Sequence, residues 1–545
     1  MKSLSLIMTA ALPLLLSIAC NNNHRIGKAN LDVVSRKLNY ENAARNKNVA
    51  EERREAQKTV SADSAKEKEF NTEEYAHIEE NKFLAVTNNP LSTFSIDVDA
   101  ASYSNVRRFL QQGTLPPPGA VRIEELINYF DYEYPQPKEE EPFSVNTEMS
   151  ACPWNSEHRL LLVGLQGKKI PMDQLPSTNL VFLIDVSGSM NEEDKLPLVK
   201  TSLKMLTDQL RDKDRVAIVV YAGNTGLVLP STEGSQKQKI KDAIDRLEAG
   251  GSTAGAAGLE LAYKIAQGNF IKGGNNRIVL ATDGDFNVGP SSDDELVAMI
   301  EKQRKTGIFL SILGFGMGNL KDEKMEQLAD KGNGNHYYID NGNEARKVLV
   351  KEFGGTLFTI AKDVKIQVEF NPAAVQSYRL IGYENRMLAA EDFNNDQKDA
   401  GELGSGHRVT ALYELIPVGV KDSFTTPVDP LKYQSKKETR ADAAADEWLT
   451  IKLRYKQPDG DVSKLITHPV GKDLVAVENA SANLRFAASV AEFGMLLRNS
   501  AFKEKSSWQQ VSELANGATG TDPEGYRREF AGLTEKAATL SLSKK

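Results

Sequence analysis

Residues 179–189 read Asn-Leu-Val-Phe-Leu-Ile-Asp-Val-Ser-Gly-Ser, in which an apolar run ends in oxygen-bearing side chains. An apolar run without polar alternation predicts a strand that is buried on both faces. Asp185, Ser187 and Ser189 follow this strand directly. Because ligands of open α/β sheets bind beyond the carboxyl ends of the strands, these three residues are candidates for a binding site.

The sequence around this strand alternates between short apolar runs and amphipathic stretches. Strands are predicted at 216–221, 278–281, 308–314 and 337–339, and helices at 195–210, 240–247, 254–266, 293–305, 320–330 and 344–358. Buried strands with intervening helices indicate a mostly parallel sheet that is covered on both faces. We therefore expect a doubly wound α/β domain over residues 176–360.

Two further segments carry oxygen ligands at matching places. Gly250-Gly251-Ser252-Thr253 precedes a predicted helix, and Thr282-Asp283-Gly284-Asp285 follows a predicted strand. Mg²⁺ prefers about six oxygen ligands and keeps several waters, which suits two carboxylates and three small hydroxyls. The site predicted from these segments consists of Asp185, Ser187, Ser189, Thr253 and Asp283. Mg²⁺ is favoured, with Mn²⁺ and Ca²⁺ left open, and Gly188 and Gly284 are expected to let the loops turn tightly.

These segments resemble the metal-ion-dependent adhesion site of von Willebrand factor A domains. The family motif Asp-x-Ser-x-Ser is matched by Asp185, Ser187 and Ser189, its threonine by Thr253, and its Thr-Asp-Gly aspartate by Asp283. The resemblance implies a divalent-metal site that binds a protein or peptide partner, often through a partner carboxylate that coordinates the metal. Asp285 lies beside the motif and outside it.

The flanking segments extend the resemblance to a bacterial lipoprotein branch of the same family. Residues 92–99 and 103–109 resemble its N-terminal segment, and residues 378–386 and 407–414 resemble its C-terminal domain. We expect an associated segment at 89–175 and a strand-rich plus helical domain at 361–545. Strands are predicted at 364–370, 409–416 and 449–455, and helices at 484–498, 508–516 and 526–540.

The N-terminus has the features of a secretory signal peptide over residues 1–19. Lys2 precedes an apolar run, and Ala19-Cys20 resembles a bacterial lipobox, although Ser17 stands where many lipoboxes carry Leu. Lipidation of Cys20 would anchor the chain to a membrane of the cell envelope. Residue 21 is Asn and not the Asp that retains lipoproteins in the inner membrane, which favours the outer membrane. The alternative is an ordinary signal peptide with an incidental Cys. Residues 20–88 are polar and charged, which predicts a disordered tether.

The only other cysteine is Cys152, so a lipidated Cys20 would exclude an intramolecular disulfide. Cys152 has no His-rich segment around it, and we interpret it as a buried structural thiol. The net charge of −8 argues against a nucleic-acid partner. The sequence contains no Gly-x-x-x-x-Gly-Lys phosphate loop. It also contains no nucleophile elbow, because Gly404-Ser405-Gly406-His407 lacks the Gly-x-Ser-x-Gly pattern. We therefore expect that the protein is not an enzyme.

Two other acidic groups could hold a metal. Asp97 and Asp99 alternate along a predicted strand at 94–99, and we favour the interpretation that Asp99 caps the helix predicted at 100–112. Asp392, Asn394 and Asp396 are spaced as in a calcium loop, but Gln397 and Leu403 replace the required Gly and Glu, which favours a polar turn. The function predicted overall is metal-dependent partner binding at the cell envelope. The alternative is an envelope assembly or scaffold factor in which the metal is structural.

Overall fold

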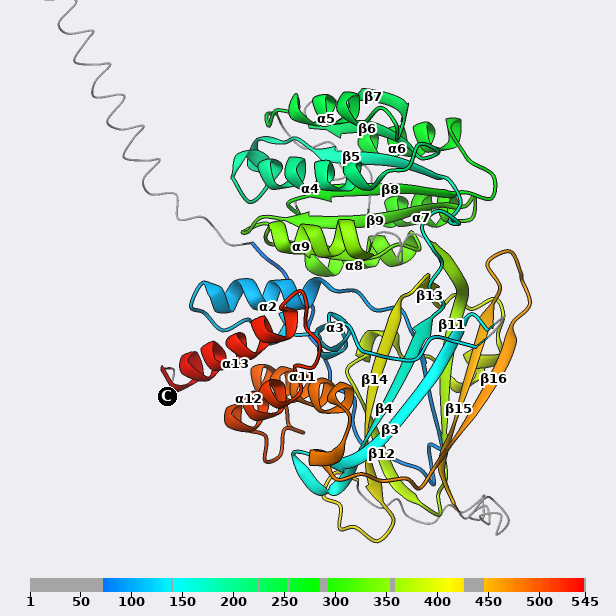
Figure 1. Ribbon diagram of the computed structural model, residues 1–545, viewed down its shortest axis with the longest axis vertical. Helices are drawn as coiled ribbons and strands as arrows, with labels where there is room; N and C mark the ends of the chain where they lie inside the picture. Colours follow the sequence, from blue (N-terminus) through cyan, green and yellow to red (C-terminus); the bar gives the residue numbers. More distant parts are fainter. Residues whose placement is uncertain are drawn as a thin grey trace, which may run out of the picture. The chain divides into compact units, whose positions relative to one another are not determined.

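The computed structural model describes residues 72–138, 141–222, 225–251, 255–284, 293–352, 358–425 and 446–543 (Figure 1). The predictions for the signal peptide, for Cys20 and for the first part of the tether lie outside the described residues. So do Thr253 and Asp285 of the predicted site region.

A six-stranded sheet forms the centre of the domain that contains the Asp-x-Ser-x-Ser motif. Its strands follow the order β10-β9-β8-β5-β6-β7, and all neighbours are parallel except β6 and β7. The strands are β5 (Thr178–Asp185), β6 (Arg215–Tyr221), β7 (Gly226–Glu233), β8 (Asn275–Thr282), β9 (Ile308–Phe315) and β10 (His336–Ile339). The predicted doubly wound α/β fold is confirmed, with β7 as an edge strand that the prediction did not include.

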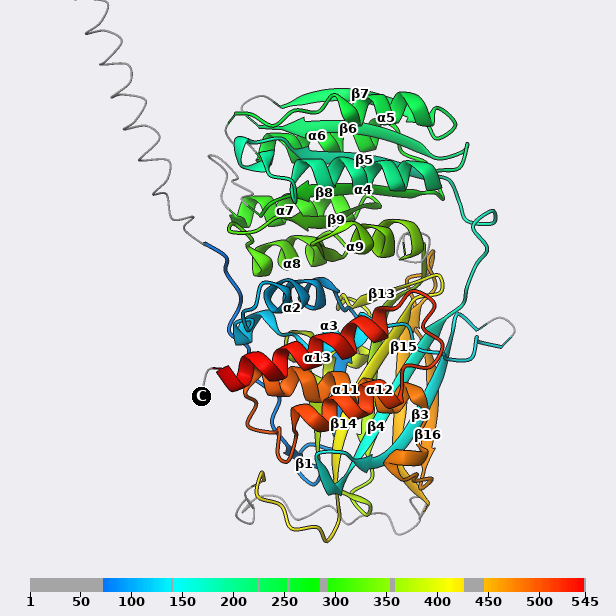
Figure 2. The ribbon, with the colours of Figure 1, turned by 60° about the vertical axis from the view of Figure 1, so that its left-hand side comes forward.

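Helices cover both faces of this sheet (Figure 2). One core contains residues of α4 (Leu196–Gln209), α5 (Lys237–Asp245) and α9 (Gly342–Arg346), which continues as a π-helix over Lys347–Glu352. The other core contains residues of α6 (Gly255–Gly268), α7 (Asp293–Arg304) and α8 (Asp322–Lys331). Every residue of β5 is buried, as a strand between two helix layers must be.

The two segments that flank this domain in the sequence form one β-sandwich. Its first sheet has the order β1-β12-β14-β4-β3, and its second has the order β13-β11-β15-β16, with β2 also paired to β11. The first sheet contains β1 (Leu84–Ala85), β3 (Phe143–Cys152), β4 (Asn155–Gly167), β12 (Val375–Ile381) and β14 (Arg408–Pro417). The second contains β2 (Leu91–Ser95), β11 (Thr359–Phe370), β13 (Gly401–Gly404), β15 (Glu447–Lys456) and β16 (Lys464–Gly471).

Strand β4 illustrates how the sandwich is layered. Leu161, Val163 and Leu165 belong to the core between the two sheets, whereas Leu160 and Leu162 belong to a separate core with the helices. Successive side chains of a strand point to opposite faces, so an apolar run in β4 means that both faces are covered. The helices of that outer layer are α2 (Ala101–Gln111), α3 (Ile123–Asn128), α11 (Ala482–Arg498), α12 (Trp508–Gly517) and α13 (Tyr526–Ser543).

Two predicted boundaries differ from the structure. The segments 89–175 and 361–545 are not separate units, because β4 pairs with β14 and β2 with β11, so the α/β domain is inserted into the sandwich. Residues 72–88, expected in the tether, pack against the fold. Phe83 and Val86 are buried, and Glu73 pairs with Arg108 at 2.9 Å. The segment was predicted as tether because its charged residues outnumber the few apolar residues that pack against the fold. Among the described helices, none is long and apolar enough to cross a bilayer.

Candidate metal centre

The three predicted segments meet at the carboxyl edge of the parallel sheet. Asp185 is the last residue of β5, and Asp283 follows the last residue of its neighbour β8. The Gly250–Gly251 segment joins them, because the N–H of Gly250 donates to the carbonyl of Val186 at 2.7 Å and that of Gly188 to the carbonyl of Gly251 at 3.1 Å. Thr253 itself lies outside the described residues, two positions beyond Gly251.

Asp185 is fully buried and held in one orientation by its neighbours. Its Oδ1 accepts a hydrogen bond from the N–H of Ser187 at 2.9 Å. Its Oδ2 accepts from the hydroxyls of Tyr221 at 3.1 Å and Thr282 at 3.3 Å. Burial raises the pKa of Asp185 to about 6, although the hydrogen bonds from Ser187 oppose the shift. A buried carboxylate of this kind fits a site that binds a cation.

Ser187 and Ser189 present their hydroxyls together. Their Oγ atoms lie 3.0 Å apart, on either side of Gly188. Two neutral oxygens this close, next to a buried carboxylate, form part of the ligand set that a hard divalent cation requires. The donor chemistry of the described residues therefore fits Mg²⁺ or a similar ion.

Asp283 is also fully buried and contacts side chains from two other elements. Its Oδ2 accepts from Nζ of Lys195 at 3.2 Å and from Nδ2 of Asn319 at 3.5 Å. Lys195 lies immediately before α4 and is only 3% exposed. The ammonium group balances part of the carboxylate charge, so the site is less anionic than two aspartates alone would make it.

Two glycines near the site allow close approaches that a side chain would block. Gly284 has φ +99°, and a Cβ there would lie 2.7 Å from the carbonyl oxygen of Asn319, so its predicted role in the turn is confirmed. Gly316 has φ +71°, and a Cβ there would lie 2.4 Å from Cγ of Lys195. Gly188 differs from the prediction. It is not among the glycines with positive φ, and an added Cβ would meet only the oxygen of Gly251 at 3.7 Å.

The sequence interpretation missed Lys195, Tyr221 and Thr282. Tyr221 and Thr282 are the last residues of β6 and β8, so their position at strand ends was a usable signal. Lys195 carried a weaker signal, as one basic residue in front of the apolar first turn of α4.

The other acidic groups serve the structure in a different way. Asp99 does not cap α2, whose N-cap is Ala100 without a side-chain hydrogen bond. Instead Asp99 is buried, accepts from the N–H of His336 at 2.7 Å and pairs with Arg386 at 3.1 Å. Asp97 lies 3.6 Å from the same guanidinium.

Asp99 also gathers with Glu125 and Glu326 in a buried group that could hold a metal by its geometry. Two arginines already face these carboxylates. Arg122 lies 2.7 Å from Glu326, and Arg386 lies 3.1 Å from both Asp99 and Glu326. We interpret this group as an ion-pair network rather than a metal site.

The residues with the calcium-like spacing at 392–396 contact strand β15 and the residue in front of strand β16. Asn394 accepts from Arg454 at 2.8 Å, and Asp396 accepts from the hydroxyl of Ser463 at 2.6 Å. These contacts agree with the interpretation as a polar turn. Cys152 is a free and buried thiol, which agrees with a structural role.

Comparison with known families covers most of the chain. Residues 179–351 match the family "von Willebrand factor type A domain", residues 69–162 match "von Willebrand factor", and residues 355–540 match "Uncharacterized protein YfbK, C-terminal". The protein YfbK of Escherichia coli is 47% identical over 473 residues, which cover 86% of this chain and 81% of that protein.

More distant similarities are confined to parts of the chain or to low identity. The magnesium-chelatase 67 kDa subunit of Chlorobaculum tepidum is 24% identical over 36% of this chain and 36% of that protein. The solved structure of a von Willebrand factor type A protein from Catenulispora acidiphila has a TM-score of 0.37 and 13% identity, and covers 86% of this chain and 98% of that chain.

Proposed function

Because the chain belongs to the YfbK family of von Willebrand factor type A proteins, we propose that it binds a protein or peptide partner through a divalent metal. The type A domain points to a protein-interaction or metal-dependent adhesion function, in a family that is generally not enzymatic. The observation that carries the proposal is the meeting of Asp185, Ser187, Ser189 and Asp283 at one sheet edge, with both carboxylates fully buried.

The ion in this proposal is Mg²⁺, held by Asp185, Ser187, Ser189, Asp283 and Thr253, and it supplies an attachment point for a carboxylate of the partner. Tyr221 and Thr282 keep the Asp185 carboxylate turned towards the site through their hydrogen bonds. The Lys195 ammonium beside Asp283 reduces the negative charge that an incoming carboxylate would meet. Such an arrangement favours an anionic ligand over a neutral one.

We further propose that a lipid on Cys20 anchors the chain in the cell envelope, with the outer membrane favoured. The support is the Ala19-Cys20 sequence after an apolar run. The buried Cys152 thiol adds to this, because it leaves Cys20 without an accessible intramolecular partner.

Replacement of Asp185 by Ala tests the metal centre. We expect the full chain to bind Mg²⁺ in isothermal titration calorimetry, and the Asp185→Ala variant to lose at least tenfold in affinity because a buried carboxylate ligand is gone. The exposed residue Asp242 on α5 offers a matched control, and Asp242→Ala should bind as the wild type does.

Partner capture is then measured in pull-downs from detergent-solubilised membranes, with EDTA added and Mg²⁺ restored. Loss and return of capture, together with loss in Asp185→Ala, would support the proposal. Capture that persists in Asp185→Ala would refute the adhesion mechanism. A collapse of thermal stability on metal removal would instead support the scaffold alternative, in which the ion is structural.

A further inference from the structure

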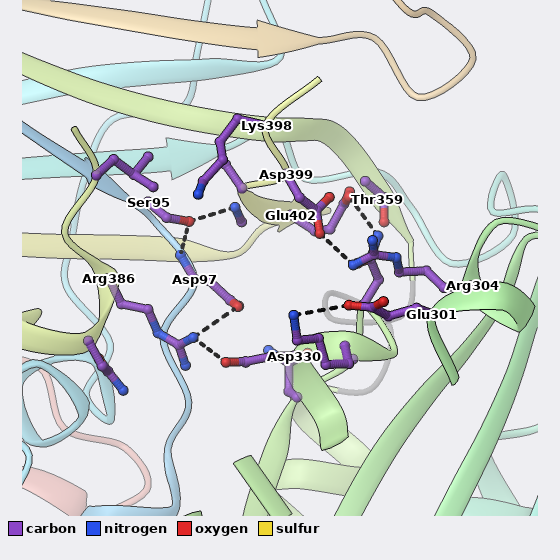
Figure 3. Close-up of a pocket in the computed structure, with 18 of the residues that line it drawn as sticks. Ser95, Asp97, Glu301, Arg304, Asp330, Thr359, Arg386, Lys398, Asp399 and Glu402 are labelled. Atoms are coloured by element: carbon purple, nitrogen blue, oxygen red, sulfur yellow. Dashed lines mark hydrogen bonds and ion pairs between the residues drawn. The ribbon is translucent and has the colours of Figure 1, made fainter. Parts of the chain in front are cut away.

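A cavity of about 470 Å³ lies between the α/β domain and the sandwich (Figure 3). The α/β domain contributes the start of β8, the end of α7 and the end of α8. The sandwich contributes β13, the start of β11 and residues 385–388. Cavities of a few hundred cubic ångströms are the size that small-molecule sites have.

The cavity is far from the metal centre. Arg277, which lines it, pairs in register with Leu180 of β5, five residues before Asp185. At about 3.3 Å per residue, the two positions are roughly 16 Å apart along the strand. The cavity therefore belongs to the opposite edge of the sheet.

Most charged groups that line the cavity are paired with each other. Arg304 pairs with Asp399 of the sandwich, Lys331 pairs with Glu301 at 3.0 Å, and Arg386 reaches Asp97 and Asp330. Figure 3 shows these pairs around the wall, some of them crossing between the two domains. They hold the wall in place and give each of these three cations at least one carboxylate partner.

Arg277 is the exception among the cations of the wall. It is only 3% exposed, yet no carboxylate of the described chain lies within 4 Å of it. Nη1 donates to the hydroxyl of Ser311 at 2.6 Å, whereas Nε and Nη2 make no hydrogen bond to any residue that the structure describes. The Phe309 ring, 5.5 Å from the guanidinium carbon, offsets only part of the desolvation.

Burial lowers the pKa of Arg277 to about 10, which agrees with a cation that lacks a counter-ion. A buried and unpaired charge is strongly unfavourable, so an anionic ligand that supplied the missing counter-charge would be stabilised at this position.

Glu402 is the corresponding exception among the acids. Its Oε1 accepts one hydrogen bond, from Nδ2 of Asn333 at 3.3 Å, and it forms no ion pair within the described ranges. Burial and the neighbouring carboxylates of Asp363 and Asp399 raise the pKa of Glu402 well above its usual value. Glu402 and Arg277 influence each other electrostatically but are too far apart to pair. The wall thus contains one unpaired cation and one unpaired carboxyl group.

We propose that this cavity binds a small zwitterion of the amino acid or short peptide class, whose carboxylate meets Arg277 and whose ammonium group meets Glu402. The free edge of a guanidinium suits a carboxylate, because the two planar groups can form paired hydrogen bonds. An ammonium group next to Glu402 keeps that carboxylate ionised. The site is independent of the divalent metal, so it goes beyond the partner-binding function.

Calorimetry on the full chain tests the site with four probes in the presence of EDTA. Glycylglycine and L-glutamine carry both charges, propionate carries the carboxylate alone, and n-butylamine carries the ammonium group alone. We expect saturable binding of at least one zwitterion, and binding at least tenfold weaker for the singly charged probes, because each lacks one charge-assisted hydrogen bond.

Two variants identify the residues. Arg277→Met and Glu402→Gln should each weaken zwitterion binding tenfold or more. Arg277→Met should also keep or raise the thermal midpoint without ligand, because it removes an unpaired buried charge. Arg246→Met, at an exposed position after α5, is the matched control and should bind as the wild type does.

The proposal is wrong if no probe gives saturable heat up to about 10 mM, which corresponds to roughly 3 kcal/mol of binding free energy. It is also wrong if propionate binds as tightly as the zwitterions, or if both variants bind unchanged. Because EDTA is present throughout, failure here leaves the metal-dependent function untouched, and failure of the Asp185→Ala test leaves this site untouched.

Discussion

Glu492 in α11 shows how one buried residue can govern the response of the fold to pH. The residue is fully buried, and its carboxylate oxygens make no well-formed hydrogen bond to the described residues. Burial raises its pKa from 4.5 to about 8, although Ser506 and the backbone of Ser507 lie near enough to oppose the shift. The folded chain therefore holds a proton there that the unfolded chain releases.

This difference predicts the sign of a pH effect. Since the folded pKa is the higher one, the contribution of Glu492 to stability is greatest below pH 4.5 and is lost as the pH rises towards about 8. The slope is at most about 1.4 kcal/mol per pH unit. Glu492→Gln should remove this slope and be more stable than the wild type at neutral pH, as measured by urea unfolding at several pH values. Glu513→Gln on the exposed face of α12 should leave the slope unchanged. Parallel pH profiles for wild type and Glu492→Gln would contradict the prediction.

Most residues of the metal centre could be predicted from sequence because the motif and the strand ends coincide. Asp185 and Asp283 were found in this way, and the structure places both at the same sheet edge. Asp99 was misinterpreted for the opposite reason. Its partner Arg386 is 287 positions away, and no local pattern indicates a pairing at that distance.

At the scale of elements, α11 packs closely against α3. A Cβ at Gly494 would lie 2.7 Å from Cγ1 of Ile123 and 3.3 Å from Cδ1 of Leu126. The helix propensity of glycine is poor, so its presence in the middle of α11 is explained by this close contact rather than by local preference.

Replacement of Gly494 by Val should therefore destabilise the fold by about 1–3 kcal/mol, because the added methyl groups overlap α3. The measurement is the free energy of unfolding in urea. Gly532 in α13 offers the contrast, since nothing lies within 4 Å of its added Cβ. Gly532→Ala should stabilise the chain by about 0.5–1 kcal/mol. Equal effects of the two replacements would show that the α3 contact does not decide the outcome.

The helices and strands of the inserted domain were predicted well because their apolar periodicity is strong. Two elements were not. Only two residues of strand β7 are buried, Leu229 and Thr232, and they are three positions apart, so the strand lacks the alternation of period two that would have indicated it. The predicted helix at 344–358 is a short α-helix that continues as a π-helix to Glu352, a change in hydrogen bonding that side-chain pattern does not reveal.

At the scale of the whole molecule, the two flanks share their β-sheets. The sheet of the inserted domain contains only strands of that domain. Strand pairs β4–β14 and β2–β11 each join one flank to the other. The sequence showed both flanks as strand-rich, but pairing between strands so far apart leaves no periodic signal in either.

Isolated fragments of the chain should differ in stability according to whether they contain all the strands of their sheets. We expect residues 176–360 alone to unfold cooperatively, since both faces of their sheet are covered by their own helices. Residues 89–175 alone should lack stable structure, because β4 loses its partner β14 and β2 loses its partner β11. Circular dichroism and thermal melts of both fragments provide the measurement. A cooperative melt of the 89–175 fragment would contradict the interleaved topology.

The insertion also sets an order in time for the growing chain. Arg408 at the start of β14 lies 241 positions after Gly167 at the end of β4 (408 − 167). At about 5–20 residues per second, synthesis of that stretch takes roughly ten to fifty seconds. Until β14 has been made, β4 has only β3 to pair with, while the inserted domain can already fold. In the nascent chain, the apolar hairpin of β3 and β4 is therefore exposed and available to a chaperone, whereas it is covered in the finished protein.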